Sequence, residues 1–251
     1  MIRTWMMTAA LALSTALPAA SQNFDIDTMS EADRAAFGEA VRDYLLANPQ
    51  LLRDWIGVLQ DHEAEAEARE DIELVADNAA ALFDDEGSWA GGNLEGDVTL
   101  VEFLDYRCSF CRRAHPEVVE LVSSDGNIRK IIKEFPILGE ESVEAARFAI
   151  SVLQIEGNDA YKVISDRLMT HRGAFTRDAL SQIADGEGLD ADAVVAHMDD
   201  GAVTEVLEAN YALAQRMNIS GTPSFVLGDA MLRGYVPLES MRDLVADYRS
   251  R

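Results

Sequence analysis

The sequence predicts an α/β protein, and three segments carry that prediction. Residues 98–104 form a short apolar, β-branched run, which is typical of a buried strand, and a second such run spans 128–135. A helical segment, 108–123, joins them, so we expect parallel strands with a right-handed crossover. Residues 223–236 read as an antiparallel hairpin, followed by a closing helix.

The first residues read as a signal peptide, 1–21. Arg3 precedes an apolar stretch of 13 residues, 5–17, and small residues then offer cleavage near 20–22. A membrane-spanning helix needs about 20 residues. We therefore expect export to the periplasm, an oxidising compartment.

Residues 22–86 are predicted to form a helical arm. Asn48 and Pro49 interrupt it as a helix cap and a first-turn proline. The 18 acids and four arginines from Asp25 to Glu86 give this arm a charge of −14. Its large apolar residues must pack on the following domain or on another copy of the chain, so the arm is either a docking stripe or an oligomerisation stalk.

The remainder, 87–251, is predicted to be one domain. A glycine-rich linker, 87–97, opens it. A helical block over about 139–219 interrupts it between the second strand and the hairpin.

Composition narrows the function classes. The chain is 48% hydrophobic and 26% charged, with a net charge of −24. Nucleic acids and anionic lipid surfaces would repel it, which makes them poor partners.

The two cysteines, Cys108 and Cys111, stand between the first strand and its helix. This spacing brings both sulfurs to one helical turn. The helix N-terminus stabilises a thiolate at Cys108, and we expect Arg107, Arg112 and Arg113 to favour it further. Cys108 would then form a mixed disulfide that Cys111 resolves.

Three other interpretations remain open. A structural disulfide closing so short a loop would stabilise little. Zinc usually needs four ligands, and His115 would supply only a third. Two thiolates suffice for Cu(I).

The segment GTPSF, residues 221–225, is the second feature. Pro223 heads a strand near the sheet centre, where a residue without an amide proton fits poorly. A cis bond in a tight turn would resolve the conflict and bring the Thr222 backbone beside the sulfurs. An ordinary turn proline is the alternative.

Together, DYRCSFC after VTLVEF, the strand end KEFPIL, and GTPSF before a hairpin resemble the DsbA-like thiol–disulfide oxidoreductases over about 88–250. This resemblance implies a thioredoxin fold with an inserted helical domain. It also implies that Cys108 is the exposed nucleophile, that Cys111 is the resolving thiol, and that Thr222 and Pro223 form a cis-proline loop that binds substrate backbone.

The arm, with its LLANPQLL segment, resembles the ScsC- and Com1-like branch, in which such arms can drive oligomerisation. The resemblance therefore implies a possible homo-oligomer through residues 30–86. It further implies protein substrates and a membrane redox partner, DsbB-like or DsbD- or ScsB-like. No separate cofactor is expected, since the cysteine pair is the redox centre.

Glu102, six positions before Cys108, matches a buried acid of the DsbA-like proteins. A carboxylate inside a strand must be paired, neutral or functional, and this one would accept a proton from Cys111. We expect Lys133, in the neighbouring strand, to be its ion-pair partner. Alternation along the strand could instead point Glu102 to solvent.

The sequence departs from the best-known DsbA pattern in two places. Ser109 and Phe110 stand between the cysteines where that pattern has Pro-His, so no histidine stabilises the thiolate from there. Thr222 before the proline is similar to isomerase-like relatives. The sequence thus predicts an exported protein disulfide oxidase or isomerase, and the alternative is a periplasmic Cu(I)-binding protein that uses the same thiols.

Overall fold

The computed structural model describes residues 28–251, so the predicted signal peptide lies outside the described residues. Within the described residues, no helix is both long and apolar enough to cross a membrane. The chain divides into two compact units, and the boundary between them in the sequence lies between Gln60 and Asp61.

The first unit holds α1 (Glu31–Ala47) and the beginning of α2 (Pro49–Asp77). Ser30 caps α1 by accepting a hydrogen bond from the Asp33 amide at 3.2 Å. In this described part of the chain no residue of α1 is buried. Large apolar side chains stay exposed on both helices, among them Tyr44, Leu46, Trp55, Ile56 and Leu59.

The second unit contains a five-stranded mixed sheet of order β1-β3-β2-β4-β5. The strands are β1 (Trp89–Gly92), β2 (Val98–Leu104), β3 (Ile128–Glu134), β4 (Ser224–Leu227) and β5 (Ala230–Arg233). As predicted, β2 and β3 are parallel, and β4 pairs antiparallel with both β2 and β5. The linker contributes β1, antiparallel to β3.

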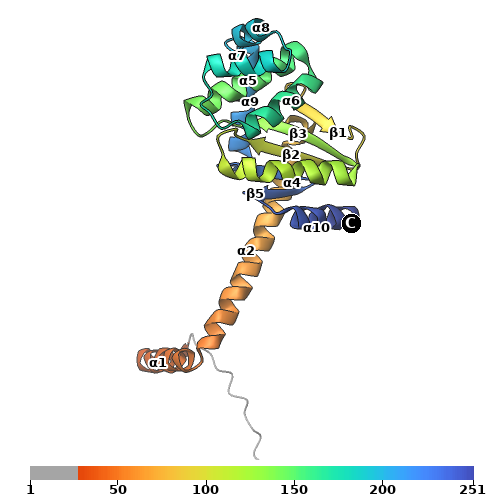
Figure 1. Ribbon diagram of the computed structural model, residues 1–251. Coiled ribbons are helices and arrows are strands. Elements are labelled where there is room, and N and C mark those ends of the chain that lie inside the picture. The colour runs from red at the N-terminus through yellow and green to blue at the C-terminus, as the bar shows by residue number, and fades with distance from the viewer. Residues whose placement is uncertain (1–27) are drawn as a thin grey trace, which may run out of the picture. The chain divides into compact units, whose positions relative to one another are not determined.

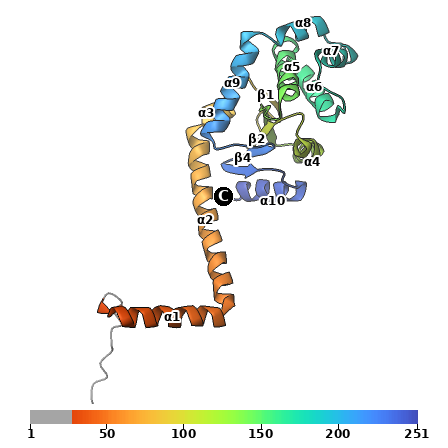
Figure 2. The same ribbon diagram turned by 90° about the vertical axis from the view of Figure 1, so that its left-hand side faces the viewer.

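Helices cover both faces of this sheet (Figures 1 and 2). On one face, α4 (Ser109–Asp125) and α10 (Leu238–Arg249) pack on Leu100 and Phe225. On the other, α3 (Ala79–Phe83), α9 (Gly201–Arg216) and the last turns of α2 pack on Val101 and Phe103. The side chains on both faces of β2 and β3, including the polar ones near the ends of these strands, are therefore shielded from water.

Five helices separate β3 from β4, in agreement with the fold class predicted from the sequence. They are α5 (Glu140–Glu156), α6 (Asn158–Thr170), α7 (Arg177–Gly186), α8 (Ala191–His197) and α9 (Gly201–Arg216). The apolar sides of α5, α6, α7 and α8 form one core with Tyr106, Cys108 and Cys111, so these four helices pack directly against the segment that carries the cysteines.

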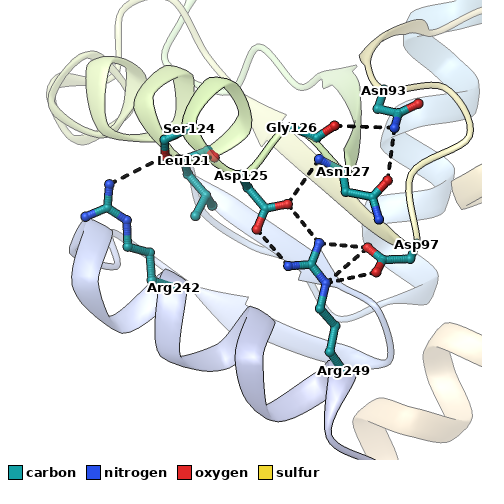
Figure 3. A network of polar contacts seen from close by, with 9 residues as sticks. All are labelled: Asn93, Asp97, Leu121, Ser124, Asp125, Gly126, Asn127, Arg242 and Arg249. Carbon is teal, nitrogen blue, oxygen red and sulfur yellow. Dashed lines mark hydrogen bonds and ion pairs between the residues drawn. The ribbon is translucent and has the colours of Figure 1, made fainter.

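Arg249 fixes the closing helix at the sheet end remote from the cysteines (Figure 3). Its guanidinium lies 2.7 Å from carboxylate oxygens of both Asp97 and Asp125. Asp125 also accepts a hydrogen bond from the Asn127 amide at 3.1 Å. One side chain thereby joins α10 to the loop before β2 and to the last residue of α4.

Replacing Arg249 with alanine should lower the free energy of unfolding by about 1 kcal/mol, because two well-oriented carboxylates lose their shared cation. Urea unfolding followed by circular dichroism measures this. The control is Arg251→Ala, which removes an exposed arginine from Asp229 and should change stability by less than about 0.5 kcal/mol. Equal urea midpoints for both variants would show that the contacts of Arg249 with Asp97 and Asp125 do not stabilise the fold.

Candidate functional site

The site is built where β2 ends. Four residues after Leu104, Cys108 takes the N-cap position of α4, as predicted. Its sulfur accepts a hydrogen bond from the Cys111 amide at 3.4 Å. A cap position exposes the sulfur to unpaired helix amides and to the positive end of the helix dipole, both of which favour a thiolate.

Both cysteines are free thiols with very different environments. Cys108 keeps 6% of its surface exposed and Cys111 keeps none, so the nucleophile is less open than the resemblance implies. The Cys111 thiol, then Thr222 and the amides of Cys111 and Phe110, lower the pKa of Cys108 from 9.0 to about 5 against the effect of burial. The hydrogen bond to Cys108 and burial raise the pKa of Cys111, and the charge of Glu102 adds to this. Cys108 is therefore the thiolate and Cys111 the protonated thiol.

The predicted proline loop is present. The Thr222–Pro223 peptide bond is cis. The Thr222 carbonyl oxygen lies 3.2 Å from the Cys108 sulfur. Ser224 closes the turn by donating its hydroxyl to the Gly221 carbonyl at 2.8 Å. The loop thus places a backbone acceptor and the Thr222 side chain directly against the nucleophile.

Sequence reasoning missed Asp105, which organises the loops around the site. Its carboxylate accepts hydrogen bonds from the amides of Arg107, Ile137 and Leu138 at 2.7, 2.8 and 3.0 Å. The Ser142 hydroxyl adds a fourth at 2.8 Å. An acid directly after a buried strand was the available signal. Asp105 holds the segment before Cys108 against the segment after β3.

The three arginines near the cysteines are engaged elsewhere, contrary to the expectation that they favour the thiolate. Arg107 lies 3.4 Å from Glu141. Arg112 donates to the carbonyls of Tyr106 and His171, both at 2.7 Å. Arg113 stacks on Tyr235, with its guanidinium carbon 4.3 Å from the ring centroid. The groups that lower the pKa of Cys108 are instead Cys111, Thr222 and backbone amides.

Glu102 is fully buried, but its partner is Lys130 and not Lys133. The Lys130 ammonium lies 2.7 Å from the Glu102 carboxylate, whereas Lys133 lies 2.5 Å from Asp85. In the parallel register Glu102 stands opposite Ile132, so residues of even number in β3 share its face. The predicted partner was wrong because Lys133 has an odd number in β3. Its side chain therefore points to the opposite face of the sheet from Glu102.

The residues between the cysteines are on the surface. Ser109 begins α4 and is exposed, and Phe110 keeps 55% of its surface exposed beside the nucleophile. His115, the candidate third zinc ligand, instead lies 3.1 Å from Asp166 of α6. Among residues 28–251, no group of three or more histidine, cysteine, aspartate or glutamate side chains is arranged to hold a metal ion.

Two family models match this chain. The model described as thioredoxin matches residues 84–247, which is more than half of the chain. The model described as the copper resistance protein ScsC N-terminal domain matches residues 33–66. The two matched segments do not overlap.

Three solved structures are similar. A thioredoxin-like oxidoreductase from Silicibacter pomeroyi is 40% identical, covers 68% of this chain and 98% of its own, and gives a TM-score of 0.64. A variant of ScsC from Proteus mirabilis is 25% identical over 89% and 98%, with a TM-score of 0.67. The thiol-disulfide exchange protein alpha-DsbA2 from Wolbachia pipientis is 25% identical over 73% and 98%, with a TM-score of 0.67.

The curated relatives are much longer proteins. The Na⁺/H⁺ antiporter NhaA 1 of Salinispora arenicola is 27% identical over 60% of this chain. The match spans 23% of that relative's length. The similarity to the antiporter thus concerns one segment of it.

Thr222 offers a test of how the thiolate is stabilised. Thr222→Val removes the hydroxyl and keeps the backbone, so the pKa of Cys108 should rise above about 5, and alkylation by iodoacetamide at pH 5 should slow by about fivefold. The matched control, Thr222→Ser, retains the hydroxyl and should keep the native pKa. Thiolate absorbance at 240 nm, recorded against pH, measures both. If valine and serine titrate alike, the Thr222 side chain does not stabilise the thiolate.

Proposed function

The chain belongs to the thioredoxin family, and on that premise we propose that it is an exported thiol–disulfide oxidoreductase that exchanges disulfides with protein substrates. One observation carries the proposal: two thiols one helical turn apart have pKa values driven in opposite directions. A thiolate at Cys108 beside a protonated, sealed Cys111 is the arrangement that disulfide exchange requires.

The exchange reaction balances in bonds and electrons without a separate cofactor. The Cys108 thiolate attacks one sulfur of a substrate disulfide, which forms a mixed disulfide and releases a substrate thiolate. Cys111 then loses its proton to the Glu102 carboxylate and attacks the Cys108 sulfur. The mixed disulfide breaks, the second substrate thiolate leaves, and Cys108 and Cys111 are oxidised to a disulfide. The reverse sequence donates that disulfide to a reduced substrate.

The low pKa of Cys108 supports a disulfide-donating direction. Because the pKa in the folded protein lies below its unfolded value, ionisation stabilises the reduced fold above the unfolded pKa. This contribution is lost as the pH falls through about 5. At neutral pH the reduced form is thus stabilised relative to the disulfide, which makes the disulfide a better oxidant.

The location and partners form the remainder of the proposal. The apolar segment 5–17 behind Arg3 supports export to the periplasm. The DsbA-like resemblance supports protein substrates and a membrane partner, DsbB-like or DsbD- or ScsB-like, that recycles the cysteine pair. Exposed Trp55 and Leu46, at 68% and 66%, support a homo-oligomer formed through the arm, residues 30–86. Such an assembly would favour isomerisation over simple oxidation.

Equilibration of the mature protein in glutathione buffers tests the exchange. The wild-type pair should titrate as a two-electron couple, as measured by trapping free thiols at each ratio. Cys108→Ser should reduce the exchange rate to the uncatalysed rate, because it removes the nucleophile. Cys111→Ser should accumulate a mixed disulfide with glutathione, visible by mass spectrometry. A wild-type pair that never exchanges would reject the proposal.

Cu(I) sequestration is a second candidate, favoured by the match of residues 33–66 to the N-terminal domain of a copper resistance protein. Two thiolates would supply the soft ligands that Cu(I) prefers. This candidate expects one Cu(I) per reduced chain, retained against bathocuproine disulfonate and lost in Cys108→Ser. A reduced chain that exchanges disulfides but yields its copper to the chelator would exclude it.

A further inference from the structure

Glu134, the last residue of β3, is a buried acid that the proposed exchange does not use. It keeps 3% of its surface exposed. One carboxylate oxygen, Oε1, accepts hydrogen bonds from the hydroxyls of Tyr106 and Tyr161 at 2.6 and 2.5 Å. The other, Oε2, is buried and has no hydrogen-bond partner among the described residues. A buried polar atom without a partner is costly, so the position calls for a functional explanation.

The side chains that face Glu134 from the surrounding elements carry no positive charge within the described chain. Strand β2 and the loop after it bring Glu102, Asp105 and Tyr106, and helix α6 brings Tyr161. Helix α9 brings Asn210, whose side-chain amide donates to the Glu134 backbone carbonyl at 3.1 Å. The other neighbours are uncharged, and they include Trp89, Ile132, Ile150, Leu153 and Val206.

Glu134 and Glu102 lie on the same face of the sheet, and only Glu102 has an ammonium partner among the described residues. Glu102 stands opposite Ile132 and Glu134 stands opposite Leu104, so the two acids are diagonal neighbours across the parallel pair. Lys130 is paired with Glu102. Two carboxylates and one ammonium in a dry core are least costly when one carboxyl carries a proton. Burial, and then the charges of Asp105 and Glu102, raise the pKa of Glu134 to about 8, although the two tyrosines oppose this.

The network reaches the cysteines by two routes. Tyr106 lies two residues before Cys108, and its carbonyl receives the Arg112 guanidinium at 2.7 Å. Glu102 interacts electrostatically with Glu134 on one side and with Cys111 on the other. A change in the charge of Glu134 therefore acts on the thiols through Glu102 and Tyr106.

Protons can reach this network from bulk water. Ser165 lies within hydrogen-bond distance of Tyr106, at 3.2 Å. Ser165 and Lys130 both line an open pocket of about 390 Å³ between β3, α4 and α6. Glu102 is thus separated from this open pocket by one side chain, Lys130, and Glu134 by two, Tyr106 and Ser165.

We propose that Glu134 is a positioning residue for the exchange reaction, which carries a proton while Glu102 is paired with Lys130, and whose charge sets the redox equilibrium of the cysteine pair above neutral pH. This inference rests on the proposed function. It assigns a role to an acid beyond the pair formed by Glu102 and Lys130.

The direction in which Glu134 shifts the redox equilibrium follows from the negative charge of its ionised form. Two glutathione thiols reduce the Cys108–Cys111 disulfide: its sulfur–sulfur bond breaks, Cys108 leaves as a thiolate, and Cys111 takes a proton from Glu102 or solvent. The glutathione is oxidised to its disulfide. The new negative charge at Cys108 makes an ionised Glu134 less favourable. By linkage, an ionised Glu134 disfavours the reduced pair by the same factor.

The test compares wild type with Glu134→Gln in glutathione buffers at pH 6.5 and pH 9.5. At pH 6.5 Glu134 is neutral, as glutamine is, so the two equilibrium constants should agree. At pH 9.5 the variant should be reduced about fivefold more readily, because it cannot ionise. The matched control is Glu208→Gln, which removes an exposed charge from α9 and should follow wild type at both pH values.

A merely structural role would shift the equilibrium equally at both pH values, and parallel curves for wild type and variant would overturn the inference. If wild type exchanges with glutathione, such a result leaves the proposed function standing; if wild type does not exchange at all, the proposed function itself fails.

A second readout covers a variant that does not fold: ¹³C-carboxyl NMR of reduced wild type should show one glutamate titrating between pH 7 and pH 9. Tyr161→Phe, which removes a donor to the charged carboxylate, should move that titration upward. The absence of such a signal would also overturn the inference.

Discussion

The parallel register of β2 against β3 is the constraint on which the site depends. It sets which side chains share a face, because successive residues of a strand point to opposite sides. Glu102, Lys130 and Glu134 consequently point to one face of the sheet, while Lys133 reaches Asp85 on the other face. A shift of one residue in either strand would exchange these sets and leave charges unpaired in both layers of the core.

The sequence was sufficient for strands β2 to β5, for the crossover and for the position of the cysteine pair at the start of a helix. Apolar runs, the C-x-x-C spacing and a proline at a strand start are local signals, and each constrains backbone or burial directly. The ion-pair partner of Glu102 could not be predicted in the same way. Lys130 and Lys133 lie three residues apart in one strand and differ only in the face of the sheet to which they point. That face depends on the register between the strands, which no local sequence pattern reveals. The arginines show the same limit, since their partners Glu141 and Tyr235 are distant in the chain.

Asp105 and Glu134 were missed for a related reason. Each looks like an ordinary acid at the end of an apolar run. Their roles arise because the ends of two parallel strands meet: Asp105 gathers amides from the segment after β3, and Glu134 receives a tyrosine from the segment after β2. The two acids thus link the loops reciprocally, and the helical block seals both from water.

The two outer strands of the sheet have a consequence for association with other chains. Both β1 and β5 are four residues long. β5 ends in Arg233, which is clamped by Asp71 at 2.6 Å, and β1 ends in two glycines. Short, charged or glycine-ended borders offer little template for a passing strand to add to the sheet. The sheet therefore protects itself from edge-to-edge aggregation, with a second copy of this chain as much as with any other exposed strand.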